Sequence, residues 1–178
     1  KDFISDRANG DNYLSQDFAW RYIKQTCDTT NEELKKSYES FIDKVQAERS
    51  KTSDLLNKKI VESEFADQLD GAYYIFMRSA KRAIELFKEE NIPLQQEIEK
   101  LTSQYSEVVS KMTIEHNGEE ITFKQAEKYL KDNDRAVRKQ VREKVNARRE
   151  QDSKFLDELL DKLIDLRNKV ALNSGFPN

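Results

Sequence analysis

The sequence is short of several residue types that other classes of protein need. Its 178 residues include one cysteine, one histidine, two prolines and four glycines. The single cysteine, Cys27, excludes an internal disulfide and a metal site built on thiolates, and the cytoplasm is the expected compartment. So few prolines and glycines leave little material for turns, which favours long helices. The glycines stand apart, so there is no glycine-rich phosphate loop.

Long apolar runs are also missing. No segment approaches the roughly 18 apolar residues that span a membrane, and the first residues lack the apolar core of a signal peptide. The formal net charge of −3 gives no general attraction to nucleic acid or anionic lipid. We therefore expect neither a membrane nor a nucleic acid as a partner.

Charge and aromatic side chains are abundant. Charged residues make up 37% of the chain, and apolar residues another 37%, whereas an average globular chain is about 25% charged. Seven tyrosines, nine phenylalanines and one tryptophan supply a core. A chain of this length buries roughly 70% of its unfolded surface. The composition indicates amphipathic helices around one core.

The first third of the chain predicts two helices. Residues 1–12 are polar and contain Gly10, so we expect a turn there. A helix over residues 13–27 follows, with Trp20 off its apolar stripe. Thr30 and Glu33 have the spacing of a capping box, which predicts a second helix to Val61 with a bend near residues 50–53. The two apolar stripes are Leu14, Phe18, Tyr22 and Ile23, and then Leu34, Tyr38, Phe41, Ile42, Val45, Leu55, Leu56, Ile60 and Val61.

Two segments with a seven-residue rhythm flank Pro93, which suits the first position of a helix. We expect them to form a coiled, antiparallel helical hairpin over residues 69–112. The two seams are Leu69, Tyr73, Phe76, Ala80, Ala83 and Phe87, and then Leu94, Ile98, Leu101, Tyr105, Val108 and Met112.

One strand-like stretch, residues 113–122, carries Asn117-Gly118 at its centre. Asn-Gly between alternating segments is a strong hairpin signal because both residues need a positive φ. We expect a short helix over residues 123–130 and a final helix from Arg135 to Asn173, with Asp132 or Asp134 as its cap and Ser174-Gly175 as its end.

The predicted fold is therefore all-α, with long antiparallel helices that include a coiled helical hairpin, and with one small β-hairpin at residues 113–122. Residues 1–112 are expected to form an amino-terminal helical region. Residues 113–178 are expected to carry the β-hairpin and a long helix that leads toward a further domain.

Few residues suggest chemistry. His116 lies beside an expected hairpin tip among the glutamates 115, 119 and 120, which we interpret as solubilising charges rather than metal ligands. No partner for a nucleophilic pair accompanies it. Cys27 has no neighbouring cation motif to activate it, so we expect a small core or boundary residue. The sequence predicts no catalytic or metal-binding residue, and it names no substrate-binding residue.

The final helix has an uneven charge. Residues 135–149 hold seven Lys or Arg and one acid, and residues 150–165 hold six acids and two lysines. Arg138, Arg142 and Arg149 share one side and could bind phosphates, but no aromatic platform for a single strand accompanies them. A solvated face with pairing inside the chain is favoured over weak nucleic-acid binding.

Scattered stretches resemble oligoendopeptidase F, of the thimet-oligopeptidase-like zinc metallopeptidases. They are AWRYIKQTCDTTNEE (19–33), FADQLDG (65–71), MTIEHNGEEIT (112–122), FKQAEKYLKDNDRAVR (123–138) and LRNKVALNSGF (166–176). The zinc motif of that family, His-Glu-x-x-His, does not occur in this sequence. The resemblance implies a helical amino-terminal portion that forms one wall of a substrate channel.

In that family zinc is bound elsewhere in the protein, and short oligopeptides are cleaved there. The chain alone is then expected to bind no zinc and to be inactive. The absence of an initial Met and the open loop at 176–178 also suggest a fragment, with surface uncovered for a missing part. We expect such a fragment to self-associate. The alternative is a stand-alone helical module that binds another protein, which would be a well-behaved monomer.

Overall fold

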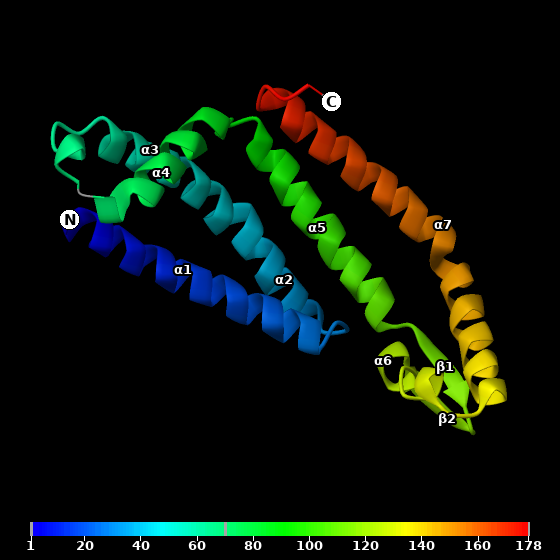
Figure 1. Cartoon of the computed structure of the whole chain (residues 1–178). Helices are drawn as coiled ribbons and strands as arrows, with labels where there is room; N and C mark the ends of the chain where they lie inside the picture. Colours follow the sequence, from blue (N-terminus) through cyan, green and yellow to red (C-terminus); the bar gives the residue numbers. More distant parts are fainter. Residues whose placement is uncertain (1, 70, 178) are drawn as a thin grey trace. The chain divides into compact units, whose positions relative to one another are not determined.

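The computed structural model describes residues 2–69 and 71–177 (Figure 1). Lys1, Asp70 and Asn178, which belong to the start, the connector and the final loop discussed above, lie outside the described residues. The helices are α1 (Asp2–Cys27), α2 (Glu32–Ser40), the π-helical η1 (Phe41–Gln46), α3 (Ala47–Val61), α4 (Tyr74–Leu86), α5 (Asn91–Ser110), α6 (Phe123–Ala126) and α7 (Arg135–Asn173). Short 3-10 turns are η2 (Ala66–Gln68), η3 (Gly71–Tyr73) and η4 (Tyr129–Lys131). The strands are β1 (Thr113–His116) and β2 (Glu119–Thr122), so a mostly helical fold with one small β-hairpin is confirmed.

The described chain divides into two compact units. The first unit comprises residues 1–100 and 166–178, and the second comprises residues 101–165. Helices α5 and α7 each contribute one part to either unit. The division predicted after residue 112 concerns the domains of a longer protein, and it stays a prediction.

In the first unit, α1 begins at Asp2, so the turn predicted for residues 1–12 is wrong. Tertiary hydrogen bonds explain the difference. Arg7 donates from Nη1 to Asn57 Oδ1 at 2.8 Å and from Nη2 to Ser53 Oγ at 3.0 Å, which holds the first turns of α1 on α3. These bonds offset the roughly 1 kcal/mol that Gly10 costs inside a helix.

The next helical rod starts one residue later than the predicted capping box. Asn31 is the N-cap, and its Oδ1 accepts from the backbone amides of Glu33 at 3.0 Å and Leu34 at 3.2 Å. Thr30 instead donates its hydroxyl to Asp28 Oδ1 at 2.8 Å. The predicted box is therefore wrong, because the Asx side chain of residue 31 competes for the same amides.

The rod then continues to Val61, as predicted, but its irregularity lies elsewhere. Residues 41–46 form the π-helical segment η1, and residues 50–53, where a bend was expected, are ordinary helix. Phe41 and Ile42 are buried within η1, and the ring of Phe41 lies 5.6 Å from that of Phe18 in α1. A π-bulge shifts the helix face by one residue, which brings both side chains into the core.

Helix α4 packs along α3 and not along α5. The coiled hairpin predicted over residues 69–112 is therefore wrong in its pairing, because the partner of α4 is α3. Ala80 is buried on α4, and Ala83 lies opposite Asp54 and Asn57 of α3. Helix α5 also has another partner than predicted, because its Gln96 donates to backbone oxygens of η1. A heptad pattern predicts a buried face, and it does not specify which helix covers that face.

In the second unit, the predicted β-hairpin is confirmed. Thr113 pairs with Thr122 and His116 with Glu119, and Asn117 and Gly118 take φ values of 55° and 79°. The core of this unit consists of Ile114, Ile121, Ala126, Val141 and Val145. Helix α7 starts at Arg135, and Asp134 Oδ1 accepts from the amide of Ala136 at 2.7 Å, so Asp134 is the cap.

Replacing the observed cap should weaken the chain more than replacing the predicted one. Asn31→Ala should lower the free energy of unfolding by about 1 kcal/mol, because two amides at the start of α2 lose their acceptor. Thr30→Ala removes only a bond to Asp28, so it should change stability by less than half of that. Urea unfolding followed by circular dichroism measures both, and a larger loss for Thr30→Ala would contradict the structure.

Candidate functional site

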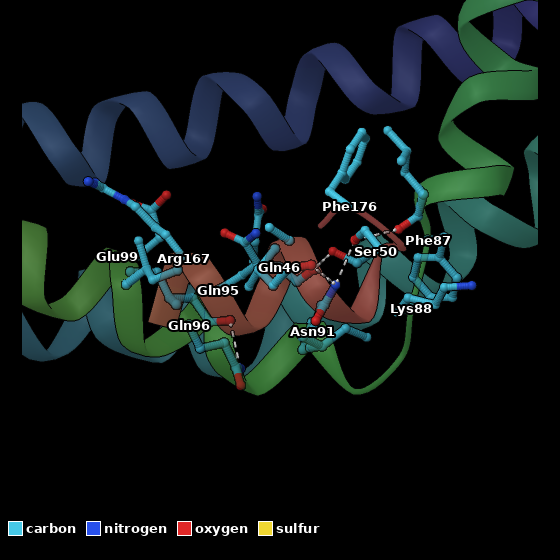
Figure 2. A pocket seen from close by; sticks show the side chains of 18 residues that line it. Gln46, Ser50, Phe87, Lys88, Asn91, Gln95, Gln96, Glu99, Arg167 and Phe176 are labelled. Carbon is cyan, nitrogen blue, oxygen red and sulfur yellow. Dashed lines mark hydrogen bonds between the residues drawn. The ribbon is translucent and has the colours of Figure 1, made fainter. Parts of the chain in front are cut away.

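The first unit contains a pocket of about 770 Å³. Three segments enclose it: η1 with the start of α3, the α4–α5 connection with the start of α5, and the last turns of α7 (Figure 2). Its volume lies within the range of ligand sites. The lining residues are Ile42, Gln46, Ala47, Ser50, Leu86, Phe87, Lys88, Asn91, Ile92, Gln95, Gln96, Ile98, Glu99, Arg167, Val170, Ala171, Ser174 and Phe176.

Asn91 ties the end of α7 to the start of α5. Its Nδ2 donates to Val170 O at 3.3 Å and to Ser174 Oγ at 3.1 Å, and its Oδ1 accepts from Asn173 Nδ2 at 2.7 Å. Asn91 is 7% exposed, so its bonds are shielded from water. Val170 O also accepts from the backbone amide of Ser174 at 3.1 Å, so Asn91 adds a second donor to a carbonyl of the last helical turn. Asn91 thus joins the α7 wall of the pocket to α5, and Ser174 Oγ adds a bond to Leu86 O at 3.4 Å.

On the opposite side of the pocket, hydrogen bonds and an ion pair join α5 to η1. Gln96 Nε2 donates to Ile42 O at 3.2 Å and to Asp43 O at 3.0 Å. Lys100 pairs with Asp43 at 2.7 Å, and its hydrogen bond to that carboxylate raises the pKa of Lys100. The two bonds of Gln96 use backbone oxygens of the π-helical segment η1.

A buried phenol lies beneath the same region. Burial first, and then the charge of Glu99, raises the pKa of Tyr38 to about 12. The phenol therefore stays neutral at physiological pH. Its ring stacks on Phe18 with centroids 5.5 Å apart, so Tyr38 contributes to the packing of α2 on α1 and does not act as an acid or base.

A second pocket of about 260 Å³ adjoins the first, because Gln46, Ser50 and Phe87 line both. It also contains Asp54, which is 5% exposed. Asp54 Oδ2 pairs with Lys58 at 2.7 Å, but its Oδ1 has no hydrogen-bond partner among the described residues. Gln46 Oε1 is likewise buried and without a partner there. Two acceptor oxygens thus lie along one continuous groove without a donor.

The sequence pattern did not predict this groove. It assigned Leu55 to the buried stripe, yet Leu55 is 65% exposed, whereas Asp54 and Asn57 are buried. A signal was present: Gln46, Ser50 and Asp54 recur at four-residue spacing, which places them on one helix face. A search of the sequence for apolar stripes does not detect a buried polar helix face of this kind.

Two residues singled out in the sequence have other environments than expected. His116, predicted to be exposed, is 5% exposed, and its ring lies 4.1 Å from that of Tyr129. It points into the second unit because strand residues alternate between faces. Cys27, predicted to be a core or boundary residue, is exposed, since it ends the last turn of α1. The glutamates 115, 119 and 120 are exposed, as expected.

The basic part of α7 makes several contacts within the second unit. Arg138 Nη1 donates to Asp132 O at 2.6 Å and to Asn133 O at 2.9 Å. Arg149 lies over the ring of Phe123, 5.3 Å from its centroid, and Lys144 donates to Glu115 O at 2.7 Å. These contacts pair part of the basic segment within the unit, and the preference for a solvated face over nucleic-acid binding stays a prediction.

Within residues 2–69 and 71–177, no group of three or more His, Cys, Asp or Glu side chains is arranged to hold a metal ion. A zinc site needs three or four such ligands, and the one histidine is buried against Tyr129. The described residues therefore do not fit zinc. None of the helices in that part of the chain has the length and hydropathy to cross a membrane.

The chain is similar to several known proteins. Residues 1–87 match the family model described as Peptidase M3 N-terminal domain. Three solved structures are similar over most of the chain. One, from Bacillus anthracis str. Ames and assigned as oligoendopeptidase F, has a TM-score of 0.81 with 24% identity over 89% of this chain and 29% of its own. A comparison with curated protein sequences gives no match.

The other two structures are more similar in sequence. PZ peptidase A with an inhibitor has a TM-score of 0.80 and 27% identity over 88% of this chain and 28% of its own. A further structure assigned as oligoendopeptidase F has a TM-score of 0.81 and 26% identity over 89% and 28%. The chain spans less than a third of the length of these relatives. The resemblance seen in the sequence, to an amino-terminal portion of oligoendopeptidase F among the M3 peptidases, is confirmed.

Asn91→Ala should loosen the end of α7. The substitution removes three hydrogen bonds and leaves Val170 O without its side-chain donor, which should cost about 1 to 3 kcal/mol. Hydrogen exchange at residues 167–175 should accelerate at least tenfold. Asn146→Ala, at an exposed position of the same helix, serves as the control. Unchanged exchange in Asn91→Ala would show that the tether does not hold this helix end.

Proposed function

We infer that the chain is the amino-terminal, non-catalytic portion of a zinc metalloendopeptidase that hydrolyses short oligopeptides. In that arrangement it forms part of the wall of the substrate channel. The observation that carries the proposal is the similarity of 88–89% of the chain to the peptidase structures above, at TM-scores of 0.80 to 0.81. The match of residues 1–87 to an M3 amino-terminal domain supports it independently.

The chemistry would be supplied by another part of the protein. The described residues contain no set of side chains fit for zinc, and the sequence contains no His-Glu-x-x-His. When bound, zinc would polarise the scissile carbonyl and activate water. The contribution of this chain is then geometric: a helical surface that limits access to short, unfolded peptides.

Exposed aromatic and aliphatic side chains support a covering partner for the first unit. Tyr13 and Trp20 of α1 are 76% and 54% exposed, and Tyr74 and Ile75 of α4 are 63% and 58% exposed. Large exposed apolar residues near one another mark interaction surfaces. In a parent enzyme, the remaining portion would cover some of them. In isolation, the chain is expected to self-associate through them.

Sequencing the source gene beyond the codon for Asn178, and then purifying its complete product, tests this function. The reading frame should continue into a His-Glu-x-x-His segment. The complete product should cleave a quenched fluorescent heptapeptide, should leave folded proteins intact, and should lose activity when 1,10-phenanthroline removes the metal. The 178-residue chain with added zinc should cleave nothing.

Two outcomes would contradict the proposal. Zinc-dependent cleavage by the 178-residue chain would show that the chemistry lies within it. A stop codon after Asn178, together with a concentration-independent monomer in sedimentation, would favour the alternative of a stand-alone helical module that binds another protein.

A further inference from the structure

Buried acceptors without donors are costly, and the groove of the first unit contains two. Gln46 Oε1 and Asp54 Oδ1 are shielded from solvent and have no hydrogen-bond partner among the described residues. An unpaired buried polar atom costs about 1 to 3 kcal/mol. Such an atom in a folded protein calls for an explanation, such as strain, a catalytic role or a bound water or ion. A ligand that brings a hydrogen-bond donor would satisfy it in the same way as a water.

The remaining groups of the groove define the chemistry of that ligand. Both unpaired atoms are acceptors, so the ligand must bring N–H or O–H donors. A carboxylate or phosphate would bring acceptors and negative charge toward Asp54, so an anion cannot satisfy these two atoms, although Lys88 and Arg167 also line the larger pocket. A metal cation is also disfavoured, because Ser53 and Asn57 already accept from Arg7 and too few oxygens remain.

The larger pocket adds an apolar floor and neutral amides. Ile42 and Ile98 are 1% and 8% exposed, and they line it together with Ile92 and Val170. Gln46 comes from one wall and Gln95 from the other (Figure 2). Side-chain amides can accept from and donate to the main chain of a peptide. An extended peptide presents N–H groups at regular intervals and side chains between them.

We propose that this groove, lined by Gln46, Asp54 and Gln95 over an apolar floor, binds an extended oligopeptide segment. On binding, the side chains of Gln46 and Asp54 rotate so that Oε1 and Oδ1 face the groove and accept from N–H groups of the peptide, and an apolar side chain occupies the larger pocket. The choice of an oligopeptide rests on the proposed function. The need for hydrogen-bond donors rests on the groove alone. No group of side chains within residues 2–69 and 71–177 fits a metal ion, so the site holds peptide without cleaving it.

Fluorescence anisotropy of a capped, fluorescein-labelled hexapeptide with central leucine and phenylalanine tests the proposal on the 178-residue chain. Capped ends remove the terminal charges, so that main-chain N–H and C=O groups and apolar side chains remain to be recognised. Binding should saturate, and a hexapeptide of serine and glycine should bind at least tenfold more weakly, since it offers nothing to the apolar floor. Acetate and phosphate should not compete.

Variants then locate the site. Gln46→Met keeps the volume and removes the acceptor, so the dissociation constant should rise about tenfold, which is the factor that one hydrogen bond contributes. Thermal stability should stay equal or rise, because an unpaired buried oxygen is lost. Asp54→Asn should weaken binding in the same direction. Gln104→Met, at an exposed position of α5, should change neither quantity.

The outcomes separate this inference from the proposed function. No saturable binding, or equal binding by the chain and by Gln46→Met, would overturn the inference, and the groove would then hold only water. Concentration-dependent assembly that blocks the peptide would assign the groove to a second copy of the chain and would also overturn it. Peptide binding that persists when the complete gene product lacks peptidase activity would contradict the proposed function and leave the inference standing.

Discussion

The amide of Asn91 is the contact on which the first unit depends most. Its three hydrogen bonds join residues about 80 positions apart in the chain, and they fix the last turn of α7 beside the first turn of α5. The residues that close the larger pocket from this side, including Val170 and Ser174, are positioned by that tether. A neutral side chain suits the task, because it donates and accepts at once without the desolvation cost of a buried charge.

The second constraint is the polar inner face of α3. Helices usually bury an apolar stripe, yet Gln46 at the end of η1 and Asp54 and Asn57 of α3 face neighbouring segments. Arg7 satisfies Asn57 from α1, and Lys58 satisfies one oxygen of Asp54. The two acceptors left over are a local cost that the apolar contacts of η1 can offset. A strained or unsatisfied group retained at a pocket is typical of a binding site.

The sequence predicted most of the helices and strands, but few of the contacts between them. The β-hairpin at 113–122 and the ends of α7 followed from turn and cap residues, which act locally. The start of α1, the partner of α4 and the burial of Asp54 depend on contacts between distant residues, which no local pattern encodes. The burial of His116 was missed for a similar reason, since only the packed hairpin brings Tyr129 over its ring. The groove could not be predicted for the same reason, because three separate segments of the chain line it.

A channel wall that also holds peptide would give such an enzyme a second contact with its substrate, away from the metal. Paramagnetic relaxation from a nitroxide-labelled hexapeptide tests this account most directly, by measuring which backbone amides of the chain lose signal. The account predicts simultaneous broadening in residues 42–54, 91–99 and 167–176. Broadening confined to the exposed face around Tyr13 and Trp20, with those three segments unaffected, would contradict it.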